Sequence, residues 1–438
     1  MINKLVQWLK NRNKLKKVII KIYRVVFSII RDNHWLNVAF HKIQTKYSNK
    51  TRIDFYRQQS VKEYSRIHHL DFKVLEEEKY REVFIPPYYN DHEASQVVSY
   101  KSPQIYITKL LDVSIIGGNS YFLKDTFVLY DMFEMDTDHR FDLRFGSIVS
   151  ISKKGEVVIE TYTTEIEKIE KGIFLIGFGS FNYYHLTVEL LSKFKYINEC
   201  EDYDNYPLIV DELVLTIPQF KDLVDSLNIT GREIIPLKKY AKYEVAEIVY
   251  ISDVSWMPIN LKGSLGLTNE DCRVSGECIE YLRNQVMRSN NISFSSDSSV
   301  KLYLSRKSSF LQRLVNEKKV ASLFESYGFK VVYPEELSLK QQVELFARAS
   351  VVVGATGAAL TNIIYCQPGT VLVSIIPKEF NFNVYSTMAH HLKIDSLYLH
   401  AQIIKRGVKI SEDLFELDLN LCERFIKEHF MERSKDEQ

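Results

Sequence analysis

Three turns in the sequence carry side chains that could do chemistry. In the first turn, which runs from Gly177 to Glu189, His185 and Glu189 are four residues apart and would share one face of a helix. An imidazole and a carboxylate at the start of a helix, beside a loop that contains glycine, could act together as a general base. An ordinary ion pair on a helix surface has the same spacing, so the pair alone leaves both interpretations open.

The second turn is basic. Arg306 and Arg313 lie in it, and Asn316 and Glu317 follow at the start of a predicted helix. Arginine presents a planar fork of hydrogen-bond donors that suits a phosphate or a pyrophosphate. A solvated basic loop would have the same composition, and Asn316 could do no more than cap its helix.

The third turn is rich in small residues and occupies residues 354–362. Its candidate binding residues are Gly354, Thr356, Gly357, Ala358 and Asn362. Small residues let backbone N–H groups approach an anion at a helix N-terminus, although any tight joint between a strand and a helix also uses them. The turn has neither the Gly-Lys-Ser/Thr of a Walker loop nor a GxGxxG pattern. No cluster of His, Asp or Glu has metal-ligand spacing, so we predict no metal ion and no cofactor.

The elements that must position these turns alternate along the chain. From residue 300 onward, strand-like runs alternate with helical patterns: strands at 301–305, 329–333, 351–354 and 370–376, helices at 316–327 and 338–349. Such alternation predicts parallel βαβ units. Before it, an apolar strand at 173–177 leads into a helical run at 183–198, and further strand-like runs occur at 207–210, 212–216 and 247–252. In an open α/β sheet, ligands bind beyond the carboxyl ends of the strands, where all three turns lie.

Taken together, the turns resemble a known family. The sequence contains, in this order, Asn182-Tyr-Tyr-His185-x-x-x-Glu189, Leu304-Ser-Arg306, Arg313-x-x-Asn316-Glu317, Pro334-Glu335-x-Leu337 and Gly354-x-x-Gly357-Ala358-Ala359-Leu360-Thr361-Asn362. In combination these motifs are similar to those of glycosyltransferase family 61, including its bacterial capsular-polysaccharide branch. The resemblance covers residues 173–377.

The resemblance implies a GT-B architecture, in which two Rossmann-like domains face a cleft and the second binds the nucleotide-sugar. It also implies an inverting transfer without an obligatory metal. Glu189 would then be the catalytic base, with His185 orienting it, binding sugar or serving as the second choice for base. The second and third turns would bind the nucleotide-sugar. The family commonly has histidine where this chain has Thr356, so a hydroxyl or another group must replace the donor of that imidazole.

The first fifty residues differ in charge from the rest of the chain. They hold twelve Lys and Arg residues and one acid, Asp32, a net +11, whereas the remainder carries a net −10. Apolar residues from Leu15 to Ile30 follow helical spacing and oppose a basic face, which favours a helix lying on an anionic membrane through residues 1–35. Packing against the protein body or a second subunit would produce the same stripe. The nearly neutral total argues against a nucleic-acid partner.

The basic N-terminal arm, residues 1–50, also indicates where in the cell the protein is located. Its longest uncharged apolar stretch, Val25–Ile30, is far shorter than the ~20 residues that a spanning helix needs. It lacks the small-residue cleavage site of a signal peptide, and the five cysteines form no CxxC pair. We therefore expect a cytoplasmic protein associated peripherally with the inner face of the cytoplasmic membrane.

These observations predict an α/β protein with three segments: a basic amphipathic arm at 1–50, a Rossmann-like acceptor domain with a β-rich start at 51–288, and a Rossmann-like nucleotide-sugar domain with a tail helix at 289–438. The predicted reaction moves a sugar from a nucleotide-sugar to a hydroxyl of a lipid-linked glycan acceptor in surface polysaccharide biosynthesis. A polysaccharide pyruvyl transferase, which would release phosphate, is one alternative. A non-catalytic membrane-associated scaffold with a degenerate site is another, suggested by Thr356.

Overall fold

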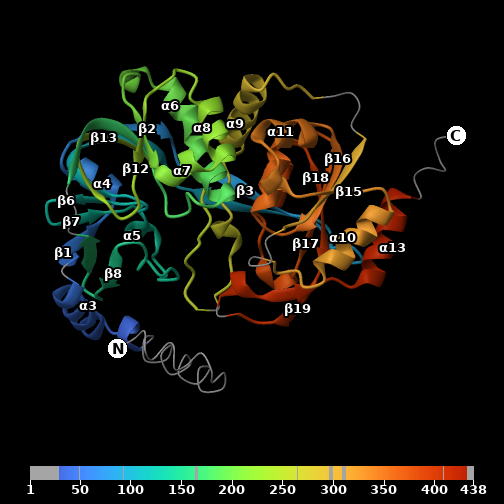
Figure 1. Ribbon diagram of the computed structural model, residues 1–438, viewed down its shortest axis with the longest axis horizontal. Helices are drawn as coiled ribbons and strands as arrows, with labels where there is room; N and C mark the ends of the chain where they lie inside the picture. Colours follow the sequence, from blue (N-terminus) through green and yellow to red (C-terminus); the bar gives the residue numbers. More distant parts are fainter. Residues whose placement is uncertain are drawn as a thin grey trace.

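Two large β-sheets organise the chain, and helices cover both (Figure 1). The computed structural model describes residues 29–48, 50–91, 93–162, 166–263, 265–294, 299–307, 312–407 and 409–431. The predicted amphipathic stripe from Leu15 to Ile30 lies almost entirely outside these residues. The α/β class is confirmed, whereas the GT-B arrangement of two domains and the three segment boundaries stay predictions.

The first sheet is mixed. Its strands run in the order β12-β11-β10-β13-β5-β6-β7-β1-β9-β8, and β2 also pairs with β5. Their bounds are β1 Thr51–Gln59, β2 Phe72–Glu76, β5 Ile105–Ile116, β6 Phe122–Lys124, β7 Phe127–Leu129, β8 Ile148–Ile151, β9 Glu156–Tyr162, β10 Glu167–Leu175, β11 Leu208–Asp211, β12 Ile234–Leu237 and β13 Lys242–Ile251. The block from β12 to β13 is parallel, so the carboxyl ends of β10 and β13 meet at one edge.

The second sheet is parallel throughout, in the order β15-β14-β16-β17-β18. Its strands are β14 Val300–Leu304, β15 Lys330–Val332, β16 Ala349–Ala355, β17 Val371–Ile376 and β18 Asp395–His400, and its helices are α10 Glu317–Ser326, α11 Leu339–Ala347, α12 Val384–His391 and α13 Leu419–Phe430, with a 3₁₀ helix at Ala358–Tyr365. This confirms the predicted βαβ units. Ser338 and Gln341 form a capping box at the start of α11, in which each side chain accepts from the other's backbone N–H.

One prediction for the elements around the first sheet is corrected by the structure. The strand expected at 212–216 is wrong, because α7 (Glu212–Thr216) is a helical turn between β11 and α8 (Pro218–Leu227). A short apolar run does not distinguish a buried strand from a helical turn by periodicity. The other helices here are α3 His34–Ser48, α4 Val61–Ile67, α5 Met132–Met135, α6 Phe194–Glu199 and α9 Gly276–Ser289.

A hairpin from the N-terminal half packs against the second sheet. It consists of β3 (Lys79–Ile85) and β4 (Gln96–Ser102). The N–H of Phe84 donates to Thr387 Oγ1 at 3.1 Å, and Ser386 Oγ donates to the Phe84 carbonyl at 2.7 Å. One hydrophobic core also contains residues from both sheets, among them Leu175 and Leu304. These contacts hold the turns of the first sheet in a fixed position relative to the turns of the second sheet.

Candidate active site

His185 and Glu189 lie in a pocket at the carboxyl ends of β10 and β13. His185 Nδ1 lies 2.8 Å from Glu189 Oε2, and the backbone N–H of Met257 donates to Oε1 at 2.7 Å. The His185 and Glu189 side chains are only 6% and 14% exposed, so the pair is not an ordinary ion pair on a helix surface. We call this space, lined by residues that include Tyr130, Glu189 and Asp253, the carboxylate pocket.

An unusual helical segment presents the pair. The predicted helix at 183–198 forms, but its type changes along the chain: a π-helix at His185–Leu190 is followed by a 3₁₀ turn at Leu191–Lys193 and by the α-helix α6 at Phe194–Glu199. π-Helical turns occur frequently at functional sites. Gly179 makes room for the imidazole, because a Cβ at Gly179 would lie 2.6 Å from the Cβ of His185.

Burial raises the pKa of Glu189, and the nearby Asp253 carboxylate raises it further, while His185 acts in the opposite direction. Desolvation is the largest of these effects because it disfavours the charged carboxylate. A carboxylate whose pKa lies above its ordinary value is a stronger proton acceptor once it is ionised. The environment of Glu189 therefore suits a general base.

Two functional candidates in this pocket were missed by the sequence analysis. Lys193 is buried, and its Nζ donates to the Ile251 carbonyl at 2.9 Å and to Asp253 Oδ1 at 3.1 Å. The Asp253 side chain is 34% exposed, so its carboxylate is held in place yet accessible. Two signals were present: Lys193 is four residues after Glu189, and Asp253 directly follows the strand-like run 247–252.

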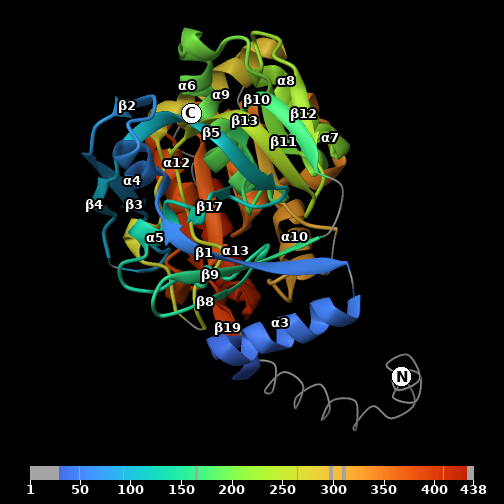
Figure 2. The same ribbon diagram turned by 90° about the vertical axis from the view of Figure 1, so that its left-hand side faces the viewer.

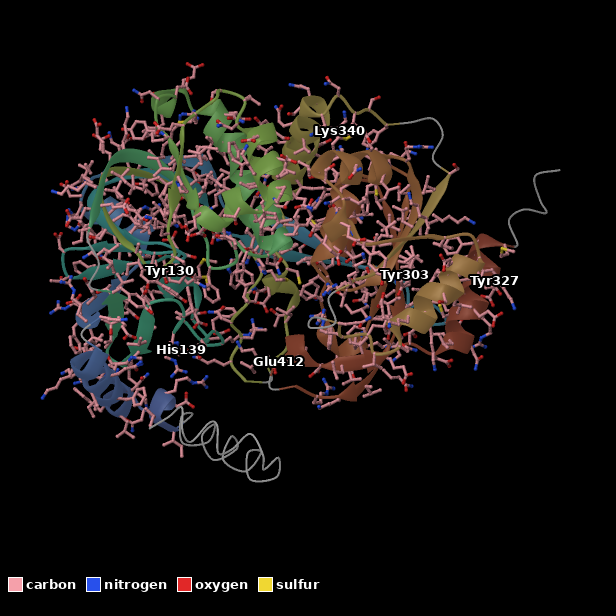
Figure 3. All side chains as sticks on the ribbon, in the orientation of Figure 1. Tyr130, His139, Tyr303, Tyr327, Lys340 and Glu412 are labelled. Carbon is pink, nitrogen blue, oxygen red and sulfur yellow. The ribbon has the colours of Figure 1, made fainter. Side chains whose placement is uncertain are left out.

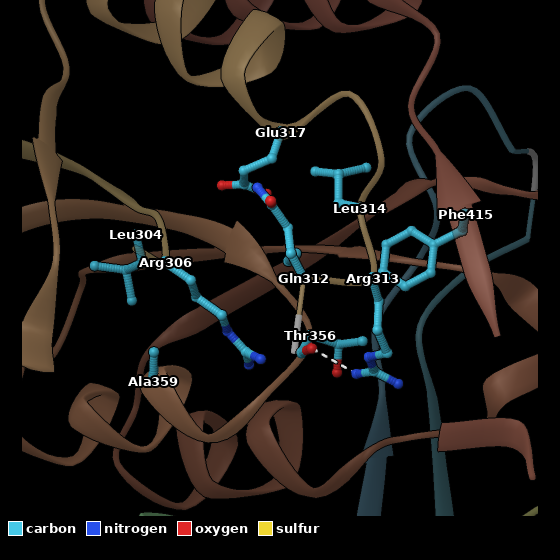
Figure 4. Close-up of a pocket in the computed structure, with 10 residues that line it drawn as sticks. Leu304, Arg306, Gln312, Arg313, Leu314, Glu317, Thr356, Ala359 and Phe415 are labelled. Atoms are coloured by element: carbon cyan, nitrogen blue, oxygen red, sulfur yellow. Dashed lines mark hydrogen bonds between the residues drawn. The ribbon is translucent and has the colours of Figure 1, made fainter. Parts of the chain in front are cut away.

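The basic turn and the small-residue turn come together in a second pocket (Figure 4). Arg306 follows β14 and Thr356 follows β16, and these strands are parallel neighbours in which Leu304 pairs with Gly354. The prediction that both turns share one carboxyl edge is therefore confirmed. We call this space the arginine pocket; it is lined by residues that include Arg306, Arg313, Glu317, Thr356 and Ala359.

Two guanidinium groups lie close together in the arginine pocket. Arg313 Nη2 donates to the Thr356 carbonyl at 2.7 Å, and its guanidinium lies over the rings of Phe380 and Phe415. Arg306 lies over Gly357, the residue after Thr356, since a Cβ at Gly357 would be 1.7 Å from Nη2 of Arg306. Burial and then the charge of Arg306 lower the pKa of Arg313 to about 10. Within the described residues, Arg313 forms no ion pair with a carboxylate.

Several donors in the same turn have no acceptor among the described residues. The Thr356 hydroxyl is buried and has no hydrogen-bond partner within the described part of the chain. Among those same residues, the backbone N–H groups of Gly357, Ala358 and Ala359 donate no hydrogen bond at the start of the 3₁₀ helix. Buried polar groups are normally satisfied, so the Thr356 hydroxyl favours a ligand that accepts its hydrogen bond. The first N–H groups of a helix have no acceptor within the helix, and beside two cations they suit an anion.

The other predicted binding residues have different surroundings. Glu317 lines the arginine pocket, where it accepts from Tyr303 Oη at 3.0 Å and where burial raises its pKa. Asn316 does not line this pocket, because its amide donates to the Leu417 carbonyl at 2.7 Å and accepts from the Leu417 N–H at 3.3 Å. Asn362 and Gly354 also lie outside the lining, and Gly354 packs against Leu304.

The residues just before His185 contact the part of the chain that contains the arginine pocket. Tyr183 Oη donates to Asn362 Oδ1 at 2.9 Å. The ring of Tyr184 meets that of Tyr385 edge-on, with the centroids 5.7 Å apart. Burial raises the pKa of Tyr385, and the charges of Arg306 and Arg313 oppose that shift, which places Tyr385 beside the arginine pocket. In Figure 3, Tyr130 of the carboxylate pocket lies on the side of the first sheet and Tyr303 on that of the second.

Over the described ranges, no group of three His, Cys, Asp or Glu side chains is placed to hold a metal ion. In the same ranges, none of the helices has the length and apolar character needed to cross a membrane.

Comparison with known proteins identifies the region that contains both pockets. Residues 183–373 match the model of the family described as Glycosyltransferase 61. The chain therefore contains a glycosyltransferase family 61 domain, and the resemblance found in the sequence is confirmed. The bacterial capsular-polysaccharide branch stays a prediction. A search of curated proteins gave no match to this chain.

Proposed function

We propose that the protein is an inverting, metal-independent glycosyltransferase whose donor is a nucleotide-sugar and whose acceptor is a hydroxyl of a lipid-linked glycan. The observation that carries this proposal is the arginine pocket. Two adjacent guanidinium groups complement a diphosphate, together with a buried hydroxyl and three N–H groups that have no hydrogen-bond partner among the described residues. The family 61 domain over residues 183–373 supports a sugar as the transferred group.

In the proposed reaction, the acceptor hydroxyl attacks the anomeric carbon of the donor sugar. The bond between that carbon and the diphosphate oxygen breaks as the new glycosidic bond forms, so a single displacement inverts the configuration. Glu189 takes the proton of the attacking hydroxyl, and the hydrogen bond to His185 Nδ1 orients its carboxylate. Arg306 and Arg313 stabilise the negative charge of the leaving diphosphate, and one preorganised donor contributes ~3–4 kcal/mol in such sites.

The carboxylate pocket supports an acceptor glycan on the first sheet. Its walls include the aromatic side chains of Tyr130, Phe145, Phe178 and Trp256. The C–H faces of a sugar ring pack well on aromatic rings, while the carboxylates of Glu189 and Asp253 can accept hydrogen bonds from its hydroxyls. Tyr183 and Tyr184, just before His185, contact Asn362 and Tyr385 in the part of the chain that contains the proposed donor site. We place the reaction at the cytoplasmic membrane surface in polysaccharide assembly, with residues 1–35 as a membrane contact.

Product analysis tests the proposal. The purified protein is incubated with a panel of nucleotide-sugars and a membrane glycan fraction, and the released nucleoside diphosphate and the anomeric configuration of the product are measured. We expect release of one nucleoside diphosphate with inversion. Release of inorganic phosphate from phosphoenolpyruvate would instead identify a pyruvyl transferase. A protein that binds no nucleotide and releases neither product would be the non-catalytic scaffold.

A further inference from the structure

The helix α3 is fixed to the outside of the first sheet by its inner face. Figure 2 shows it alongside β1, β8 and β9. Val38 is buried there, Asn37 Nδ2 donates to the Val149 carbonyl at 2.7 Å, and His34 Nδ1 lies 2.9 Å from Ser150 Oγ. Because these contacts hold one face of the helix, the orientation of its opposite face is set by the fold.

That opposite face is apolar. Trp35 is 76% exposed, Leu36 48% and Ile43 59%, and Ile29 just before the helix is 59% exposed. Trp35 and Ile43 are eight residues apart and Leu36 and Ile43 seven apart, so they lie on the same side of the helix. A cluster of large apolar side chains in water is unfavourable, and such clusters mark surfaces that meet another apolar phase.

The charges on α3 itself are positive. Lys42 and Lys46 are exposed on α3, and its sequence contains no Asp or Glu, while Arg31 just before it is paired with Asp32. Tryptophan and aliphatic residues bordered by lysine are typical of helices that lie in the interface of an anionic bilayer. Two copies of the same basic face would repel each other, and a nucleic acid would leave the aliphatic side chains in water.

We propose that the outward face of α3, formed by Ile29, Trp35, Leu36 and Ile43, docks on an anionic lipid bilayer. The side chains of Trp35 and Ile43 enter the boundary between headgroups and acyl chains, while Lys42 and Lys46 lie at the phosphate level. This surface overlaps the predicted contact of residues 1–35 at Ile29 and Trp35, but it extends along α3 to Ile43. Because α3 is packed on the folded body, docking through this face fixes the orientation of that body on the membrane.

The docking face is linked to the carboxylate pocket. Arg144 donates to the Arg31 carbonyl at 2.5 Å and to Asp32 Oδ1 at 3.2 Å, just before α3. The next residue, Phe145, lines the pocket. If the proposed function holds, on which this step rests, a bilayer bound to α3 holds the acceptor pocket close to the lipid surface. A lipid-linked acceptor would then reach Glu189 without leaving the membrane.

Direct contact is tested by tryptophan quenching with the full chain. The sequence has three tryptophans, so Trp8→Phe leaves Trp35 and the half-buried Trp256. Vesicles of phosphatidylcholine and phosphatidylglycerol that contain brominated lipid should quench part of the emission of this variant. The quenching should disappear when Trp35→Ser is added. Unchanged emission of a protein that co-sediments with the vesicles would overturn the proposal.

Affinity is tested by co-sedimentation with a matched control. The double variant Trp35→Ser/Ile43→Ser should bind anionic vesicles roughly tenfold or more weakly than wild type, because it removes exposed apolar area from the interface. The control Tyr80→Ser/Ile229→Ser removes side chains that are 76% and 57% exposed elsewhere and should bind as wild type does. Equal losses in both double variants, or a dimer in solution that only Trp35→Ser/Ile43→Ser dissociates, would refute membrane docking by α3.

The vesicle assays contain neither donor nor acceptor, so their outcome is independent of the proposed transferase activity. Once transferase activity has been measured for the wild type, the Trp35→Ser/Ile43→Ser variant should lose turnover on a membrane-embedded acceptor and retain it on a short water-soluble acceptor. Equal loss on both acceptors would contradict a role of α3 in presenting the lipid-linked substrate.

Discussion

Replacement of Arg313 by methionine should weaken nucleotide binding and leave the fold at least as stable as before. Methionine keeps an unbranched apolar chain against Phe380 and Phe415 but removes the guanidinium. In the unliganded protein that guanidinium is half-buried beside Arg306, and burial together with this like charge lowers the pKa of Arg313 to about 10. The positive charge of Arg313 therefore destabilises the fold unless an anion neutralises it.

The size of both effects follows from this arrangement. A hydrogen bond between a guanidinium and a phosphate contributes ~1.5–3 kcal/mol, which corresponds to a loss of roughly 10–100-fold in affinity for a nucleoside diphosphate. The free energy of unfolding should stay unchanged or rise by up to about 1 kcal/mol, because partial exposure screens the repulsion that is removed. The lost hydrogen bond to the Thr356 carbonyl limits this gain.

Two measurements on the same Arg313→Met sample decide the matter. Calorimetric titration compares a nucleoside diphosphate that wild type binds with the corresponding nucleoside, whose affinity should stay within about twofold because it lacks the phosphates. Urea unfolding gives the stability. If the affinity for the diphosphate is unaltered while unfolding becomes easier by about 2 kcal/mol or more, Arg313 is a structural residue and our assignment of the arginine pocket is wrong.

Four further predictions concern the two pockets. Glu189→Gln should lower turnover by ~10²-fold or more with donor affinity retained, as measured by single-turnover kinetics and titration. Burial raises the pKa of Glu189, so activity should be lost as the pH falls through a value above that of an ordinary glutamate; Asp253→Asn, which removes a nearby negative charge, should move this limb of the kcat/KM profile to lower pH. Gly357→Ala should displace the Arg306 guanidinium and weaken diphosphate binding in calorimetry, with nucleoside binding unchanged. Thr356→Val should preserve or raise the melting temperature, since the buried hydroxyl has no partner in the described chain, but reduce donor affinity several-fold.

Local patterns predicted much of the second sheet and one pair of site residues. The strands expected at 301–305 and 351–354 and the helix expected at 338–349 depend on neighbouring residues, and β14, β16 and α11 form nearly where expected. The spacing of His185 and Glu189 likewise indicated their contact, because four residues bring two side chains together on any helical segment. What could be predicted was therefore short-range in sequence.

Long-range pairing explains what was missed. Lys193 and Asp253 are sixty residues apart and meet because β10 and β13 are parallel neighbours, with Ile173 opposite Val249. The packing of the β3–β4 hairpin on α12 and the contact of Tyr183 with Asn362 are also non-local. No single-sequence pattern gives strand order, and the burial that changes the pKa of Glu189 depends on that order.

The energetics of both pockets bear on whether the site is active or degenerate. Glu189 is a buried acid with Asp253 nearby, Arg306 and Arg313 repel each other, and Thr356 keeps a hydroxyl without a partner in the described chain. Each of these groups lowers the stability of the unliganded protein, and none would be useful in a scaffold that binds no ligand. A diphosphate in one pocket and a sugar hydroxyl in the other would satisfy all of them together. The concentration of these unfavourable groups in the two pockets therefore favours an enzyme over a scaffold, even though Thr356 stands where the resemblance implies a histidine.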